Sequence, residues 1–250
     1  MLTYILACLV GLSLGLLGSG GSVLAVPILK FSAGLSAREA VATSLATVGS
    51  VSLIGGLMAW RQGRVVWKVA GIFSLLATIG TFAGVELAKR MHGKMQMGLF
   101  ILIMFVATIR MFRGKKQSAE EEKGEEQSPG HIVPLFLKAF SVGLLTGIVG
   151  VGGGFLIVPA LVALFHLPMK KATGTSLVVI AVNSAVGTMR YSQAVEMDWG
   201  FTGIFVGAAV LGLVAGMSFS KKLDDDKLRV LFAYGLALVS LYTTWKEFLA

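Results

Sequence analysis

Eight long apolar segments, separated by short polar stretches, make up most of the chain. They cover roughly residues 2–31, 39–60, 67–88, 95–112, 134–165, 172–190, 199–219 and 228–249. Stretches of about 20 apolar residues have the length that an α-helix needs to cross the hydrocarbon core of a membrane. The pattern therefore predicts an all-α, polytopic membrane protein with four apolar segments in each half of the chain.

The first segment of each half is interrupted by a dense run of glycines. The two runs are Gly18-Ser-Gly-Gly-Ser22 and Gly150-Val-Gly-Gly-Gly154, and a proline follows each of them, at Pro27 and Pro159. Glycine weakens a helix interior, and backbone groups freed inside hydrocarbon need protein or water around them. Each half is therefore predicted to begin with a broken helix, either re-entrant or discontinuous.

The two halves repeat each other at a constant offset of 132 residues. From Val10 to Leu29, 11 of the 20 positions are identical to the positions 132 residues later. Thr43-Ser44-Leu45 returns as Thr175-Ser176-Leu177, and Trp67 returns as Trp199. A duplication predicts two membrane repeats within one integral membrane domain, with a polar, highly charged linker between them: residues 1–113, linker 114–131 and residues 132–250.

The positions of the basic residues bear on the membrane topology. If all eight segments crossed the membrane, the lysines and arginines would divide 11 to 11 between the two sides. If each broken segment enters and returns on one side, 15 of them share the side of the linker and 7 lie opposite. Basic residues favour the cytoplasmic side, so we favour two re-entrant hairpins of half-depth helices, six crossing helices, inverted repeats and a cytoplasmic linker. The alternative, in which the broken segments cross, is left open.

Composition narrows the function classes. Hydrophobic residues make up 55% of the chain and charged ones 14%, and the net charge is +9. In a membrane protein, a basic balance indicates loops beside anionic lipid, a partner we expect, and not nucleic acid. One cysteine and three scattered histidines, with no nucleophile, acid–base pair or metal-ligand spacing, predict no cofactor, no metal and no enzyme activity. No motif in the sequence identifies a binding partner or specifies the possible homodimer.

The glycine runs are the strongest candidates for chemistry. A helix that restarts after a break offers unpaired N–H groups and the positive end of its dipole, which bind anions. Two such starts facing each other would form an uncharged site for a small anionic substrate, with nearby hydroxyls as further donors. The candidate binding residues are Gly18, Ser19, Gly20, Gly21, Ser22, Thr43, Ser44, Gly150, Gly152, Gly153, Gly154, Thr175, Ser176, Asn183 and Arg190.

Each candidate also has a purely structural explanation. Glycines spaced as Gly11-xxx-Gly15 let helices approach closely, and hydroxyls early in a helix cap it. A buried amide such as Asn183 bridges helices, and Arg190 can extend its charge to the membrane surface. These alternatives stay open at the level of sequence.

The glycine phrase identifies a family resemblance. Gly147-Ile-Val-Gly-Val-Gly-Gly-Gly-Phe-Leu-Ile-Val-Pro159, its copy from Gly15 to Pro27, the Ala-Thr-Gly-Thr-Ser-Leu run at 172–177 and the layout of two times four segments resemble the TauE/SafE family of sulfite and organosulfonate exporters. The resemblance covers essentially the whole chain and implies a permease of the bacterial or archaeal inner (plasma) membrane. Ser19 and Ser22 stand where the second half has Val151 and Gly154, which makes the two half-sites chemically unequal.

The function expected from residues and resemblance together is secondary transport, most simply export, of a small sulfur-containing anion such as sulfite or an organosulfonate. An anion channel without alternating access is the first alternative. A membrane assembly or structural protein, in which the glycines serve packing alone, is the second.

Overall fold

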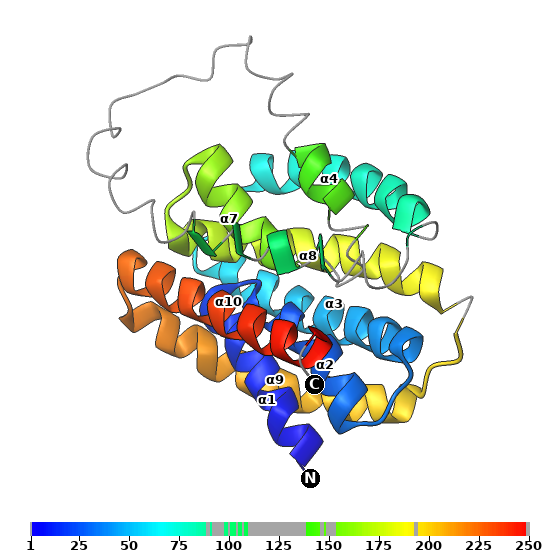
Figure 1. The fold of residues 1–250 in the computed structure, drawn as a ribbon. Coiled ribbons are helices and arrows are strands. Elements are labelled where there is room, and N and C mark those ends of the chain that lie inside the picture. Colours follow the sequence, from blue (N-terminus) through cyan, green and yellow to red (C-terminus); the bar gives the residue numbers. More distant parts are fainter. Residues whose placement is uncertain are drawn as a thin grey trace.

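The computed structural model describes residues 2–88, 91, 98–99, 101–103, 105–106, 108–109, 139–145, 148, 154–192 and 195–248. All regular structure in these ranges is helical, which confirms the predicted fold class. The helices are α1 (Leu2–Leu17), α2 (Gly20–Ser32), α3 (Ala37–Arg61), α4 (Trp67–Ala88), α7 (Gly154–Phe165), α8 (Met169–Tyr191), α9 (Trp199–Lys222) and α10 (Asp225–Phe248) (Figure 1). The linker at 114–131 lies outside the described residues.

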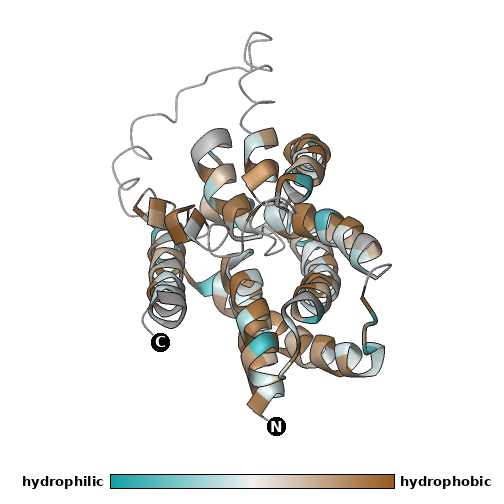
Figure 2. Cartoon of the chain, turned by 45° about the vertical axis from the view of Figure 1, so that its right-hand side comes forward, coloured by the Kyte–Doolittle hydropathy of each residue, from teal (hydrophilic) through white to brown (hydrophobic). Residues whose placement is uncertain are grey.

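Four helices of the described part are long and apolar enough to cross a membrane. They span Glu39–Arg61, Trp67–Gly84, Met169–Met189 and Trp199–Lys222. Large apolar side chains project outward from them, with Leu53, Leu75 and Leu211 each about two-thirds exposed, and Figure 2 shows hydrophobic residues along the outer faces of the helices. Apolar surface on this scale belongs against lipid, so the chain is a multi-pass membrane protein.

Two of the six predicted crossing helices are not among these four. The segment 95–112 is described at too few positions for its bounds to be given. Helix α10 is 24 residues long but begins with acidic residues, at Asp225 and Asp226, which lower the mean hydropathy of its first turns.

The first glycine run separates two helices that fold back on each other. The hydroxyl of Thr3, near the start of α1, lies 3.1 Å from the hydroxyl of Ser32, at the end of α2. Gly18, between the helices, has a φ of +75°, which an L side chain adopts only with strain. The segment 2–31 is therefore a hairpin whose two ends lie together. Its re-entry into the membrane from one side stays a prediction.

Helix α1 packs along α9 through glycines. A Cβ at Gly11 would collide with the carbonyl oxygen of Ala209, and one at Gly212 with that of Cys8. The ring centroids of Tyr4 and Phe201 lie 6.3 Å apart, so the two helices run parallel. The close-packing explanation of the Gly11-xxx-Gly15 spacing is therefore confirmed.

The length of α1 bears on the half-depth prediction, which stays a prediction. Its 16 residues rise about 24 Å. It accompanies α9 from Phe201, near the start of that helix, as far as Met217, whose N–H lies beside Gly15. Packed in parallel along α9, α1 runs beside more than half of that helix before it breaks.

The same packing recurs 132 residues away. A Cβ at Gly143 would collide with the carbonyl oxygen of Ala77, and one at Gly80 with that of Phe140. These four residues are the offset partners of Gly11, Ala209, Gly212 and Cys8. The first segment of each half thus packs on the third long helix of the other half.

The central pair of helices, α3 and α8, is antiparallel. Gly55 packs against Leu177 and Gly187 packs against Leu45, and each residue of one contact lies 132 positions from a residue of the other. Helices at equivalent positions of the two halves therefore run in opposite directions. Inverted repeats would produce these paired contacts; the duplication itself stays a prediction from sequence.

Basic residues gather at one end of the bundle. Because α3 and α8 are antiparallel, α3 ends where α8 begins, and the loop between α3 and α4 reaches the end of α9 through a hydrogen bond of 3.0 Å from Arg64 to Ser220. This end, called the basic end below, carries Arg61, Arg64, Lys68, Lys170, Lys171, Lys221, Lys222 and Lys227. All eight fall on the side that the charge count assigned to the linker.

Candidate anion-binding site at the first helix break

The turn between α1 and α2 packs against the second turn of α8. A Cβ at Gly18 would lie 2.7 Å from the carbonyl oxygen of Thr173 and 2.8 Å from Oγ of Ser176. The Ser176 hydroxyl lies 2.8 Å from the carbonyl oxygen of Thr173 and 3.3 Å from that of Gly18, and these two acceptors share its one proton. Only glycine satisfies both the backbone conformation and the available space at this position.

The first turns of α2 and α7 meet further along α8. A Cβ at Gly154, the first residue of α7, would lie 2.5 Å from Oγ of Ser22 and 3.1 Å from Cδ1 of Ile180. Ile180 is 11 residues into α8, about 16 Å from its start. The predicted convergence of the two restarted helices is therefore present for Gly154 and Ser22, near the middle of α8.

The first amides of α2 are left without a side-chain cap. Ser19 occupies the N-cap position, but its hydroxyl makes no capping hydrogen bond. The Ser22 hydroxyl donates instead to the carbonyl oxygen of Ser19, at 2.8 Å. Since the first amides of a helix have no intrahelical acceptor, the N–H groups of Gly20 and Gly21 are available to a ligand. Both glycines also pack closely on α1, Gly21 against Val10 and Leu14.

Two buried hydroxyls in residues next to Gly18 have no partner in the described part of the chain, although the side-chain atom of Thr173 nearest to Gly18 is its methyl Cγ2. They are Oγ of Ser19, fully buried, and Oγ1 of Thr173, in a residue 4% exposed. Buried polar groups in folded proteins are nearly always hydrogen-bonded. Each is therefore an unused donor in the described residues. Thr173 was missed as a candidate, although it lies in the 172–177 run that carries the family resemblance.

The four predicted hydroxyls do not form one group. Thr175 accepts a hydrogen bond of 3.0 Å from the N–H of Val66, which ties α8 to the loop before α4. Thr43 and Ser44 are buried near the start of α3, where the neighbouring Leu45 packs on Gly187. Gly187 is 11 residues beyond Ser176, about 16 Å along α8.

The remaining candidates lie elsewhere or outside the described residues. Asn183 accepts a hydrogen bond of 2.7 Å from the hydroxyl of Thr78 and so bridges α8 and α4, as its structural explanation expected. The structure does not describe Gly150, Gly152, Gly153 or the side chain of Arg190.

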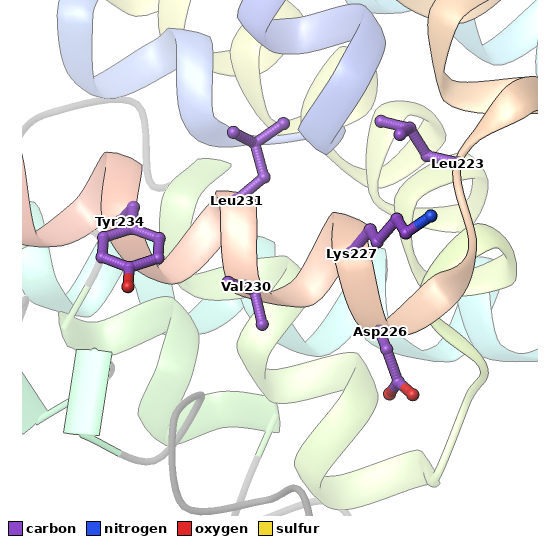
Figure 3. A pocket seen from close by; sticks show the side chains of 6 residues that line it. All are labelled: Leu223, Asp226, Lys227, Val230, Leu231 and Tyr234. Carbon is purple, nitrogen blue, oxygen red and sulfur yellow. The ribbon is translucent and has the colours of Figure 1, made fainter.

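A separate hollow lies on α10 at the basic end. It encloses about 500 Å³ and is lined by Leu223, Asp226, Lys227, Val230, Leu231 and Tyr234 (Figure 3). The Lys227 ammonium lies 3.5 Å from the Asp224 carboxylate. Paired in this way, and with Asp226 on the same wall, Lys227 offers an anion little. Across the described residues, His, Cys, Asp and Glu form no group of three that would hold a metal ion.

Comparison with known proteins identifies the family. The family model described as sulfite exporter TauE/SafE matches residues 3–243. A probable membrane transporter protein of Xylella fastidiosa is 31% identical over 247 residues, which cover 96% of this chain and 92% of that protein. The probable membrane transporter protein YunE of Bacillus subtilis is 23% identical, over an alignment that covers 95% of this chain and 96% of that protein. No solved structure matches. The chain therefore belongs to the sulfite exporter TauE/SafE family.

Proposed function

We propose that this protein is a secondary transporter that exports a small sulfur-containing anion, such as sulfite or an organosulfonate. Family membership and the long apolar helices make it a multi-pass membrane transporter. The substrate class is inferred from the family description and from the chemistry of the first helix break. The observation that carries the proposal is the pair of buried, unpartnered hydroxyls of Ser19 and Thr173 beside the uncapped start of α2.

The anion lies between the start of α2 and the second turn of α8. The N–H groups of Gly20 and Gly21 donate from one side, and the hydroxyls of Ser19 and Thr173 donate from others. These residues carry no net charge, so the positive end of the α2 dipole supplies the electrostatic attraction. Neutral donors bind an anion without the desolvation cost of a buried cation, which favours release on the other side.

The second break supplies the matching half-site. Ser44 is the offset partner of Ser176, and Gly150 is the offset partner of Gly18. Thr43 and Ser44 are therefore expected to belong to a second cluster toward the opposite end of α3 and α8, whose glycines at 150, 152 and 153 lie outside the described residues. Alternating access follows if the two hairpin-bearing halves rock against each other and expose one break at a time.

Anion binding to the purified, full-length protein tests the proposal. Thermal unfolding in detergent is measured with sulfite, sulfate, thiosulfate, sulfoacetate and taurine, and the wild type is expected to be stabilised by at least one of the sulfur anions. A lost hydrogen bond to a charged ligand costs about 1.5–3 kcal/mol, so Ser19→Ala and Thr173→Val should each weaken binding about 10- to 100-fold.

Ser74→Ala is the matched control, because the Ser74 hydroxyl is also buried and unpartnered but lies on α4. Binding unchanged in Ser19→Ala and Thr173→Val would place the anion elsewhere. Flux in proteoliposomes then separates the alternatives. Saturable transport with counterflow indicates a carrier, and conductance without counterflow indicates a channel. If no anion is transported, the result favours the membrane assembly protein.

A further inference from the structure

Arg64 is a half-buried cation in the loop between α3 and α4, at the basic end. Its Nη1 donates a hydrogen bond of 3.0 Å to Oγ of Ser220, a residue of α9 that is 1% exposed. The Ser220 hydroxyl in turn donates to the carbonyl oxygen of Met217, at 3.2 Å. Arginine is thus held in place by a neutral group that is itself fixed.

No carboxylate in the described part of the chain pairs with this guanidinium. Burial lowers the pKa of Arg64, and the charge of Asp225 only partly opposes that shift. Arginine nevertheless stays protonated at neutral pH. Because Ser220 fixes the guanidinium without neutralising it, a positive charge partly removed from water remains available to an anion.

The backbone of Arg64 packs on the turn of α8 that also contacts the first helix break. A Cβ at Gly174 would lie 2.6 Å from the carbonyl oxygen of Arg64 and 2.8 Å from its Cβ, whereas the adjacent Thr173 packs on Gly18. Arg64 and Gly18 therefore contact the same turn of α8 from different faces, because Gly174 and Thr175 point away from the face that carries Thr173 and Ser176.

The contacts of α9 place Ser220 at the same level along the bundle as the first helix break. Gly216, four residues before Ser220, packs against the N–H of Leu16, which is two residues before Gly18. Ser220 is therefore at the height of the break on the helix that packs along α1. Arg64 reaches this level from the basic end through its hydrogen bond to Ser220.

We propose that Arg64 is an anion-binding residue at the entrance to the break from the basic end. This inference rests on the proposed function and adds a cation to a site otherwise built from neutral donors. Arg64 draws the anion toward Ser19 and Thr173, and its planar fork donates two hydrogen bonds to two oxygens of one sulfur centre. Sulfite and sulfonates present that pair of oxygens, so the fork selects oxyanions over spherical anions such as chloride.

Transport kinetics of the full-length protein in proteoliposomes test this role. Sulfite flux from the basic-end side is compared for wild type, Arg64→Gln and Arg64→Lys. We expect the KM for sulfite to rise about tenfold or more in Arg64→Gln, because a charged hydrogen bond is lost, and to rise less in Arg64→Lys, which keeps the charge but not the fork. The wild-type KM should also rise with ionic strength, and that of Arg64→Gln should not.

Arg61→Gln is the matched control, since Arg61 is an exposed arginine at the same end of the bundle. Its KM should stay within about twofold of wild type, because an exposed charge is screened by salt. Ser220→Ala keeps the cation and removes only its neutral partner, so its KM should rise less than that of Arg64→Gln.

The outcomes separate this inference from the function it rests on. If the wild type binds and transports none of the sulfur anions, the proposed function fails and the inference fails with it. If the wild type transports sulfite and a folded Arg64→Gln variant keeps its KM and salt dependence, only the role of Arg64 fails. Should Arg64→Gln not fold, a wild-type KM in Arg64→Lys with unchanged preference for sulfite over chloride would also overturn it.

Discussion

Two properties of Gly18 act together at the first helix break. Its φ of +75° lies in the left-handed region, and a Cβ there would lie 2.7 Å from a backbone oxygen of α8. Gly34 has nearly the same φ, +71°, but nothing lies within 4 Å of the position its Cβ would occupy. Both positions require a positive φ, but only Gly18 also requires the absence of a side chain for reasons of space. Comparing the two therefore distinguishes these requirements.

Gly18→Ala is expected to reduce sulfite transport at least tenfold, because the added methyl group pushes the break away from Thr173 and Ser176. Gly34→Ala carries the same backbone strain, about 1–2 kcal/mol, and should lower stability while leaving the KM unchanged. Flux assays and thermal unfolding of both variants check this. Equal transport by the two variants would mean that contact with α8 is not needed.

At the scale of elements, a seam of glycines joins α1 to α9. Gly11, Gly15, Gly212 and Gly216 each face backbone atoms of the opposite helix. In hydrocarbon, helices associate through close packing of this kind, since apolar side chains gain little by leaving lipid. The seam positions the break, because within the described part of the chain α1 makes its most extensive contact with α9.

Gly212→Ala should destabilise the protein by about 1–3 kcal/mol, the usual cost of forcing extra volume into a packed interface. Gly207→Ala is the control on the same helix, because nothing lies within 4 Å of its Cβ position. There the change removes backbone freedom from the unfolded chain and should stabilise by about 0.5–1 kcal/mol. Unfolding in detergent measures both. A destabilised Gly207→Ala variant would show that the difference is not one of space.

The start of α9 is fixed by a side-chain cap. The carboxylate of Asp198 accepts a hydrogen bond of 2.9 Å from the N–H of Phe201. Asp198→Ala should lower the free energy of unfolding by about 1 kcal/mol, whereas Asp198→Asn, which keeps an acceptor, should change it little. Comparing the unfolding midpoints of the two variants checks this, and equal losses would assign the effect to charge.

For the whole molecule, the basic end and the paired glycine contacts define an orientation. The open ends of the first hairpin, at Thr3 and Ser32, lie at the end of the bundle opposite the loop that holds Arg64. Basic residues favour the cytoplasm. We therefore expect the basic end to face the cytoplasm and the hairpin to open to the outside, which is the orientation proposed from sequence.

Cysteine labelling tests this orientation. Cys8 is the one cysteine of the chain, so a Cys8→Ser background accepts single cysteines at Ala33 and Lys222. An impermeant maleimide should label Ala33→Cys in intact cells and Lys222→Cys only in inverted vesicles. Labelling of both cysteines from the same side would contradict the placement of the hairpin opening and the basic end at opposite ends of the bundle.

Much of the fold was predictable from local residue properties. Apolar length marked the helices, and glycine density marked the break between Leu17 and Gly20, because both act within a few residues of sequence. The grouping of Thr43 and Ser44 with Thr175 and Ser176 was not reliable. The offset relates the two pairs in sequence, but antiparallel packing of α3 on α8 places them at opposite ends of the pair.

The sequence by itself determined that this is a helical membrane protein of the TauE/SafE family, with broken helices and an excess of basic residues. Those properties follow from composition and local backbone chemistry. Only the tertiary structure decided which groups meet: Thr173 beside Gly18, Gly154 beside Ser22, and Arg64 on Ser220, 156 residues away. Contacts at such separations depend on how whole helices pack, and glycine seams that leave no room for a side chain set that packing.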